Sequence, residues 1–113
     1  MKTLKLAPEL VRKILSGEKT STWRLFDDKD LQEGDVLLFL NKKDGEEFGT
    51  AKVTALSIKT LGTLTDSDWE GHERFESEEK MYETYRSYYG DAVSKGSEVK
   101  ILSFEFTPTS SDQ

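Results

Sequence analysis

A short segment of the chain, residues 16–24, places a lysine, several hydroxyl side chains and an arginine close together. Lys19 and Thr22 are three residues apart, and Arg24 follows two residues later. A threonine hydroxyl is a weak nucleophile at neutral pH and needs a nearby base to accept its proton. A lysine amine can be that base if burial or a positive neighbour, such as Arg24, lowers its pKa. The segment therefore fits nucleophilic catalysis, and it also fits an ordinary strand whose Lys19 and Arg24 face solvent.

The catalytic interpretation of this segment sets a condition on the backbone. Residues three apart on a regular strand point to opposite faces, so Lys19 and Thr22 would not meet on one strand. Gly17 favours a turn at this point, because glycine adopts backbone conformations that other residues avoid. We therefore expect Lys19 to lie in a turn that precedes the strand carrying Thr22.

A second candidate region is acidic. Residues 66–83 carry eight acidic and two basic side chains, and they include Glu70, Glu73 and His72, the single histidine of the chain. On a helix, Glu70 and Glu73 would share a face while His72 pointed elsewhere. Crowded carboxylates raise one another's pKa, which suits a general acid. The alternative is a solvated helix face, with His72 exposed or capping a helix.

Two tryptophans lie near these two regions, Trp23 in the first and Trp69 in the second. As core residues they need no further role. Either ring can instead stack on a nucleobase, a contact that contributes about 1–3 kcal/mol in nucleic-acid binders. The tyrosines between residues 81 and 89 have helical spacing, which predicts packing.

Composition narrows the chemistry further. The 113 residues include no cysteine and one histidine, so thiol nucleophiles and disulfides are excluded and the usual ligands of zinc are missing. We predict that neither a metal nor an organic cofactor is required. The longest apolar run, residues 36–40, is too short to span a bilayer, which predicts a soluble, cytoplasmic protein without a membrane partner.

The charge of the chain is unevenly distributed. The formal net charge is −6, and an acidic chain binds nucleic acid poorly because such binding depends on phosphate neutralisation. DNA is therefore not an expected partner. Residues 1–24, however, carry six basic and two acidic side chains, which leaves a local basic surface for RNA.

The order of elements predicts an α+β protein in which strands dominate. Alternation, β-branched residues, caps and the Asp44-Gly45 hairpin signal mark the elements. We expect strands near residues 4–6, 20–25, 36–40, 48–58 and 98–106, and helices near residues 8–17, after Thr65 and over 77–90. Residues 1–106 then form one domain, a small, partly closed mixed β-barrel of five to six strands with two to three helices, and residues 107–113 form a disordered tail.

Three strand patterns carry finer expectations. The apolar run 36–40 predicts a strand buried on both faces. In the next strand, Ala51, Val53 and Ala55 are expected on one buried face. In the last strand, residues 102, 104 and 106 should face one way, and residues 99 and 101 the other.

The segment Ile14–Arg24, with the sequence Ile-Leu-Ser-Gly-Glu-Lys-Thr-Ser-Thr-Trp-Arg, resembles the ASCH domain, a member of the PUA-like β-barrel superfold. The resemblance continues through residues 34–36, 53–55 and 99–104, so it covers nearly the whole chain. Some single-domain ASCH proteins are N(4)-acetylcytidine amidohydrolases, which release acetate and cytidine. Others have been assigned to RNA binding or RNA cleavage.

For an amidohydrolase, the resemblance implies that Thr22 attacks the acetyl carbonyl, that Lys19 takes its proton, and that Glu73 or Glu70 protonates the departing nitrogen. Substrate contacts are expected from four further side chains: Arg24, Trp23, Trp69 and His72. The partner would be a small nucleoside or a single-stranded or modified RNA. The alternatives are an RNA-binding module without catalysis and a metal-independent ribonuclease, which would lack the usual pair of histidines.

Overall fold

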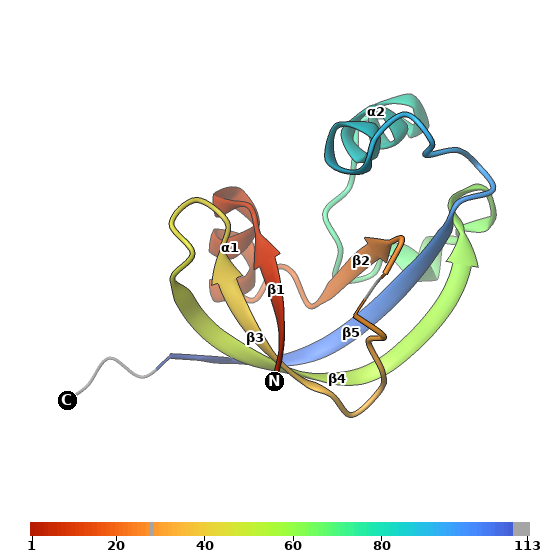
Figure 1. The fold of residues 1–113 in the computed structure, drawn as a ribbon. Coiled ribbons are helices and arrows are strands. Elements are labelled where there is room, and N and C mark those ends of the chain that lie inside the picture. The colour runs from red at the N-terminus through yellow and green to blue at the C-terminus, as the bar shows by residue number, and fades with distance from the viewer. Residues whose placement is uncertain (28, 110–113) are drawn as a thin grey trace.

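The computed structural model describes residues 1–27 and 29–109. Within these residues, five strands form one sheet, joined by two α-helices and two short 3-10 helices (Figure 1). The elements in chain order are β1 (Lys2–Leu6), α1 (Pro8–Leu15), β2 (Ser21–Leu25), β3 (Val36–Asn41), β4 (Glu47–Thr60), η1 (Leu61–Thr63), η2 (Asp66–Trp69), α2 (Glu78–Tyr89) and β5 (Glu98–Pro108).

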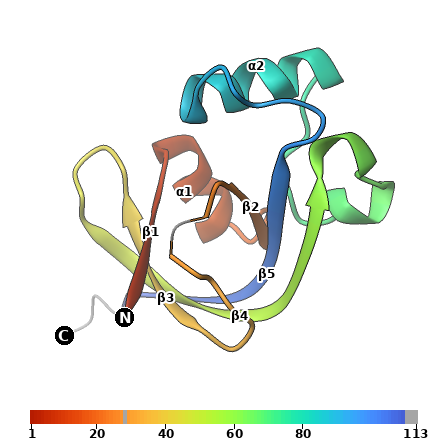
Figure 2. The ribbon, with the colours of Figure 1, turned by 45° about the vertical axis from the view of Figure 1, so that its right-hand side comes forward.

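The sheet has the strand order β1-β3-β4-β5-β2 and is mixed. β1 pairs with β3 in parallel, and the other neighbours are antiparallel. The sheet curls into a half-barrel, with α1 beside β1 and α2 over the opposite end (Figures 1 and 2). β1 and β2 are its two edges. The predicted α+β class and small mixed barrel are confirmed.

The long strand β5 contributes to two hydrophobic clusters. Leu102, Phe104 and Phe106 pack with β1, β3 and α1 in a first cluster, whereas Val99 and Ile101 pack with β2 and α2 in a second. This division is the predicted alternation of the two faces, and it makes β5 a structural link between both ends of the barrel.

Two of the strand expectations are wrong. Val36 is 44% exposed whereas Leu37 and Phe39 are buried, so only one face of β3 packs on the core. In β4, Ala51 and Val53 are buried but Ala55 is exposed. The pairing of β4 with β5 shifts register between Val53 and Ala55, and such a bulge turns the following residues to the other face.

The helix ends follow the expected chemistry. Gly17 after α1 has a φ of 87°, and Gly90 after α2 has a φ of 102°; both angles favour glycine. Ser77 caps α2, because its hydroxyl accepts a hydrogen bond from the Lys80 amide at 3.1 Å. The capping box at Thr65 is present, but it begins a single 3-10 turn, η2.

Residues 70–77 are not helical. Gly71 has a φ of 73° and turns the chain after η2. Glu70 and Glu73 therefore do not lie on one helix face, which is the arrangement expected from the sequence. β5 continues to Pro108, paired with Gly49, two residues beyond the predicted end of the domain. Residues 110–113 of the predicted tail lie outside the described residues.

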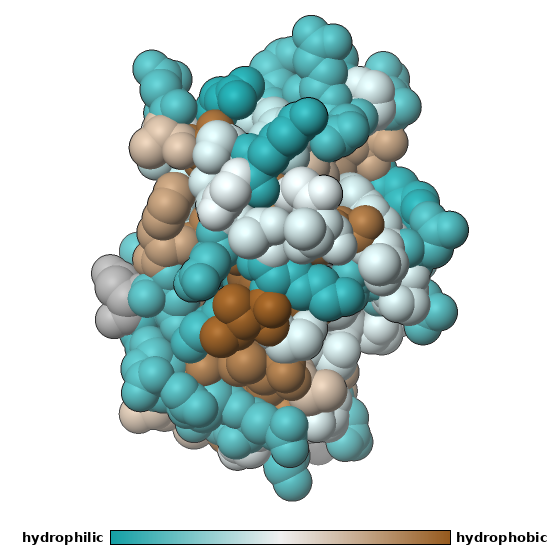
Figure 3. Space-filling model, turned by 90° about the vertical axis from the view of Figure 1, so that its right-hand side faces the viewer, coloured by the Kyte–Doolittle hydropathy of each residue, from teal (hydrophilic) through white to brown (hydrophobic). Residues whose placement is uncertain are grey.

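The described part of the chain contains no helix of the length and apolar character needed to cross a membrane. On the face drawn in Figure 3, hydrophilic side chains surround side chains of intermediate hydropathy and a hydrophobic patch below the centre.

Candidate active site

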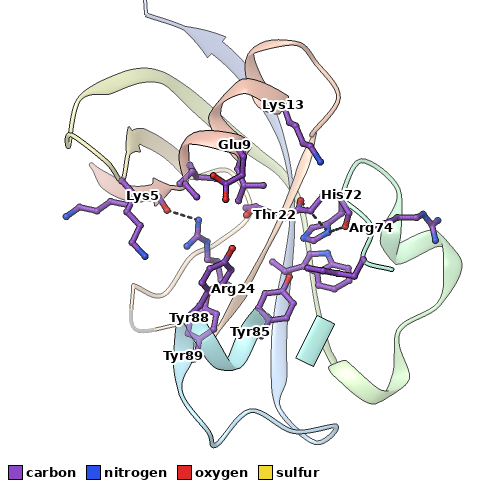
Figure 4. A pocket seen from close by; sticks show the side chains of 17 residues that line it. Lys5, Glu9, Lys13, Thr22, Arg24, His72, Arg74, Tyr85, Tyr88 and Tyr89 are labelled. Atoms are coloured by element: carbon purple, nitrogen blue, oxygen red, sulfur yellow. Dashed lines mark hydrogen bonds and ion pairs between the residues drawn. The ribbon is translucent and has the colours of Figure 1, made fainter. Parts of the chain in front are cut away.

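Most of the predicted site residues line a single pocket of about 340 Å³ at the open side of the half-barrel (Figure 4). The edge strands β1 and β2, the helices α1 and α2, the turn after β3 and the loop 70–77 all contribute to its wall. The lining residues are Lys5, Leu6, Ala7, Glu9, Leu10, Lys13, Thr22, Trp23, Arg24, Lys42, His72, Glu73, Arg74, Phe75, Tyr85, Tyr88 and Tyr89.

The pocket exists because β1 and β2 are not paired with each other. A long hydrogen bond spans this seam: Nη2 of Arg24 donates to the backbone carbonyl of Lys5 at 3.4 Å. Thr22 and Arg24 are two residues apart on β2 and so share a face of the strand. Both line the pocket (Figure 4).

Lys19 lies in the turn before β2, as predicted. Its backbone amide donates to the Lys13 carbonyl at 3.1 Å, which folds the chain back against the end of α1. The Lys19 side chain is 1% exposed, and its Nζ lies 2.5 Å from Oε1 of Glu73. Burial lowers the pKa of Lys19, Glu73 opposes this shift, and Arg24 and Lys13 reinforce it.

Lys19 is not among the residues that line the pocket, whereas Glu73 is. The ion pair therefore links the buried amine to the pocket through the carboxylate. The expectation that Lys19 and Thr22 share one cavity holds only in this indirect form, because the Lys19 side chain reaches Glu73 and does not itself line the cavity wall.

The loop that carries Glu73 is held at the start of β2. The Gly71 carbonyl accepts hydrogen bonds from the amides of Thr20 and Ser21 at 2.8 and 3.0 Å. The Ser21 hydroxyl donates to the Glu70 carbonyl at 3.3 Å. These contacts attach the acidic segment to the basic one and set Glu73 beside Lys19.

The pKa of Glu73 is shifted in the direction opposite to the expectation. Burial alone would raise it, but the charges of His72 and Lys19 and the hydrogen bond from Lys19 hold it below its ordinary value. The expected crowding by Glu70 does not arise, because Glu70 is exposed and outside the pocket lining. Glu73 is therefore ionised at neutral pH.

His72 is buried, which rules out the exposed alternative. Its Nδ1 lies 2.7 Å from the Glu73 carbonyl oxygen; because a carbonyl only accepts, Nδ1 carries the proton. The ring stacks on Trp23 with centroids 4.0 Å apart. Burial, with the charge of Lys19 as the next cause, lowers the pKa of His72 to about 4, so the ring is neutral at neutral pH.

The pocket thus brings together five of the eight predicted site residues: Thr22, Trp23, Arg24, His72 and Glu73. Lys19 joins them through Glu73. Glu70 and Trp69 do not line the pocket; Trp69 packs beside Trp23, with ring centroids 4.5 Å apart, and supports the wall from behind. The loop geometry separates Glu70 from Glu73, since Gly71 reverses the chain between them.

Several pocket residues were not identified from the sequence as site residues. The tyrosines of α2, at positions 85, 88 and 89, were expected only to pack, yet they form one wall of the cavity (Figure 4). Their i, i+3, i+4 spacing was the available signal. Lys5 belongs to the basic segment 1–24, but its position beside the site had no local signal, and Lys42 had none either, because β1 and the turn after β3 meet the site only in the folded chain.

Among the residues that the structure describes, no group of three or more His, Asp or Glu side chains is placed to hold a metal ion. The chemistry that this pocket offers from its own side chains is a hydroxyl, an ionised carboxylate held by a buried ammonium, a neutral imidazole and a guanidinium.

Comparison with known proteins shows that the fold of this chain is similar to those of solved structures. No family model matches the chain, and no curated protein matches it. Several solved structures superpose over most of its length. Protein EF3133 of Enterococcus faecalis V583, of the DUF984 family, is 16% identical with a TM-score of 0.74, covering 93% of this chain and 74% of its own.

Among the solved structures are those of two ASCH proteins. That of Zymomonas mobilis is 18% identical with a TM-score of 0.67, covering 94% of this chain and 68% of its own. The ASCH domain of Lactobacillus crispatus JV V101 is 17% identical with a TM-score of 0.68, covering 96% of this chain and 81% of its own. The chain therefore has the fold of the ASCH domains, as the segment Ile14–Arg24 indicated.

Proposed function

We propose that this protein is an amidohydrolase that removes the acetyl group from N(4)-acetylcytidine. The observation that carries the proposal is the placement of Glu73: this residue lines the same pocket as Thr22, and its carboxylate is paired with the buried Lys19 at 2.5 Å. A hydroxyl, a nearby ionised carboxylate and a fixed positive charge are the groups needed for acyl transfer.

The pocket suits a nucleoside in size and lining. Its volume of about 340 Å³ lies in the range of small-ligand sites, about 300–1,000 Å³. Aromatic rings of Trp23, Phe75, Tyr85 and Tyr89 contribute to the wall, and such rings stack on a flat pyrimidine base. Arg24 supplies donors for a base carbonyl or another acceptor.

In the reaction that we propose, the Thr22 hydroxyl oxygen attacks the acetyl carbonyl carbon and its proton passes to the Glu73 carboxylate. Glu73 then gives this proton to N4 as the C–N bond breaks, so that cytidine leaves with an amino group. Water attacks the acetyl-threonine ester, Glu73 takes one proton from that water and returns it to Oγ1 of Thr22, and acetic acid leaves and releases its remaining proton to solvent to give acetate.

This assignment modifies the roles that the resemblance implied. Lys19 was expected to act as the base, but it is an ammonium paired with Glu73 and does not line the pocket. Glu73 is ionised, so it begins the cycle as a base and becomes an acid only after taking the proton from Thr22. Lys19 is then a positioning residue that orients Glu73 and favours its charged form.

The test is to incubate the protein with N(4)-acetylcytidine and follow cytidine release. We expect Thr22→Ala and Glu73→Gln to lower kcat/KM by about 10²- to 10⁴-fold, the contribution of a nucleophile or a general base. Glu70→Gln is the matched control, because Glu70 is exposed and outside the pocket. No release by the wild type, or full activity of Thr22→Ala, would refute the proposal.

A second candidate is RNA binding without catalysis. It is favoured by the pocket lining, where lysines and arginines outnumber carboxylates. Under this alternative, Glu73→Gln retains RNA affinity, and the affinity falls as salt rises. A metal-independent ribonuclease is a weaker candidate, because His72 is neutral, buried and without a second histidine to share acid and base roles.

A further inference from the structure

Five cationic side chains line the pocket, which is unexpected in a chain of net charge −6. They come from β1, α1, β2, the turn after β3 and the loop 70–77: Lys5, Lys13, Arg24, Lys42 and Arg74. Two carboxylates, Glu9 and Glu73, share the lining, and Glu73 is already neutralised by Lys19. The wall thus carries an excess of positive charge.

Three of these residues lie at the seam between the two edge strands. Nη2 of Arg24 lies 3.4 Å from the Lys5 carbonyl, which brings β2 to β1 (Figure 4). The Lys42 amide donates to the Leu6 carbonyl at 2.8 Å, so the turn after β3 is attached to the end of β1. The Lys42 ammonium lies over the Tyr88 ring, 5.9 Å from its centroid.

The cations at the seam have no ion-pair partner within the described part of the chain. The six ion pairs found there involve other basic residues, and none includes Lys5, Arg24 or Lys42. Nε of Arg24 is buried and has no hydrogen-bond partner among the described residues. A buried donor without an acceptor is costly, and Arg24 lines the pocket, where a ligand can supply acceptors to its guanidinium.

The missing acceptor has a definable chemistry. A guanidinium and two ammonium groups from residues that line one pocket match a phosphate, which offers several oxygens and up to two negative charges. The aromatic wall next to it matches a nucleobase. We propose that the ligand enters this pocket as a phosphorylated nucleoside, with its phosphate bound between Arg24, Lys5 and Lys42. The nucleoside part of this inference rests on the proposed function.

The phosphate can belong to a free mononucleotide or to the backbone of an RNA. Both present the same oxygens to Arg24, and the same cations would contact either. Binding measurements separate these sources, and they need no turnover.

The test compares ligands that differ only in a phosphate. Calorimetric titration with cytidine and cytidine 5′-monophosphate should show the nucleotide binding about 10- to 100-fold more tightly at low salt, the effect of charge-assisted hydrogen bonds. Added salt should reduce the preference. Arg24→Met and Lys42→Met should each reduce it too. Lys43→Met is the matched control, since Lys43 is exposed, adjacent in sequence and outside the pocket.

Three further measurements make the outcome decisive. A five-nucleotide RNA with a central cytidine that binds more tightly than the mononucleotide assigns the subsite to RNA; weaker binding assigns it to the free nucleotide. The pair adenosine and adenosine 5′-monophosphate tests the phosphate subsite even if the cytidine assignment fails. If Arg24→Met does not fold, the preference for the nucleotide is measured in Lys5→Met and Lys42→Met, because Lys5 and Lys42 are exposed. Equal affinity for each nucleoside and its phosphorylated forms, or a preference unchanged in the variants, would overturn the proposal.

Discussion

At the scale of single residues, the central feature is a lysine that is almost completely buried and paired with a glutamate facing a pocket. The two partners differ in exposure: the Lys19 side chain is 1% exposed and the Glu73 side chain 16%. Removing one partner leaves the other as an uncompensated charge. The cost should therefore depend on which of the two remains.

The first prediction concerns this asymmetry. Glu73→Leu should lower the free energy of unfolding by about 3–5 kcal/mol, because it leaves a buried ammonium without a partner. Lys19→Met should cost less, because the remaining carboxylate reaches solvent. The double variant should recover much of the loss. Urea unfolding of the four proteins measures these differences, and strictly additive effects would contradict the pairing.

The second prediction concerns His72, whose pKa is about 4 in the folded protein against 6.5 for an unperturbed histidine. Between these values the unfolded chain binds a proton that the folded protein does not. Stability should therefore fall as pH is lowered from 6.5 to 4, by about 3 kcal/mol from this residue.

His72→Gln is the matched variant for this pH dependence, because it lacks the titrating group but keeps a polar side chain. The unfolding free energy, measured at intervals between pH 7 and 4, should fall less steeply in His72→Gln than in the wild type. Below about pH 5 carboxylates also titrate, and the contribution of Glu73 depends on His72, so the two proteins are compared between pH 6.5 and 5. Parallel curves would show that His72 is not held neutral by burial.

At the scale of elements, the loop 70–77 decides which acidic side chain reaches the pocket. Gly71 combines a φ of 73° with carbonyl contacts to the start of β2. A Cβ at this position would overlap Oγ1 of Thr20. The position thus needs glycine both for its backbone conformation and for the close approach of the loop to β2.

The third prediction uses this position. Gly71→Ala should weaken binding of the phosphorylated nucleoside and lower stability by more than 1–2 kcal/mol, the approximate cost of a left-handed conformation with a Cβ. Gly45→Ala is the control, since Gly45 has a φ of 74° but nothing within 4 Å of an added Cβ. Calorimetric binding and thermal unfolding compare the two. Equal effects of both substitutions on binding would contradict a special role for the loop contact.

At the scale of the whole molecule, two hydrophobic clusters share the long strand β5. The first cluster packs around Phe39 and the second around Trp23. β4 and β5 pair over most of their length, so neither cluster can lose its packing without disturbing strands that the other needs. The domain should unfold as one cooperative unit.

The fourth prediction tests this coupling. Phe39→Ala removes a fully buried ring from the first cluster and should cost about 3–5 kcal/mol. Both tryptophans lie in or against the second cluster, so their fluorescence reports that region. The fluorescence and circular dichroism transitions should shift together to lower denaturant. Ile58→Ala, at an exposed position of β4, should change stability by less than about 0.5 kcal/mol. A tryptophan transition unchanged in Phe39→Ala would show independent clusters.

The fold class and most local structure could be predicted from the sequence because they depend on short-range chemistry. Gly17 and Gly90 end helices, Ser77 begins one, and the alternation of residues 99–106 assigns each side chain to a face. The predictions were wrong at positions where the exposure of a side chain depends on the neighbouring strands. The bulge after Val53 and the exposure of Val36 depend on how β4 and β3 pair and pack, which no local pattern contains.

For the candidate site, too, some features could be predicted from the sequence and others could not. Residue types alone determined that the chemistry must come from hydroxyl, lysine, arginine and carboxylate groups, since the chain has no cysteine and one histidine. Spacing alone indicated that Lys19 precedes the strand of Thr22. Only the tertiary structure selected Glu73 over Glu70, reversed the expected shift of the Glu73 pKa and added Lys5, Lys42 and the tyrosines of α2. Burial and charge at a site depend on segments distant in sequence, and only folding brings those segments into contact.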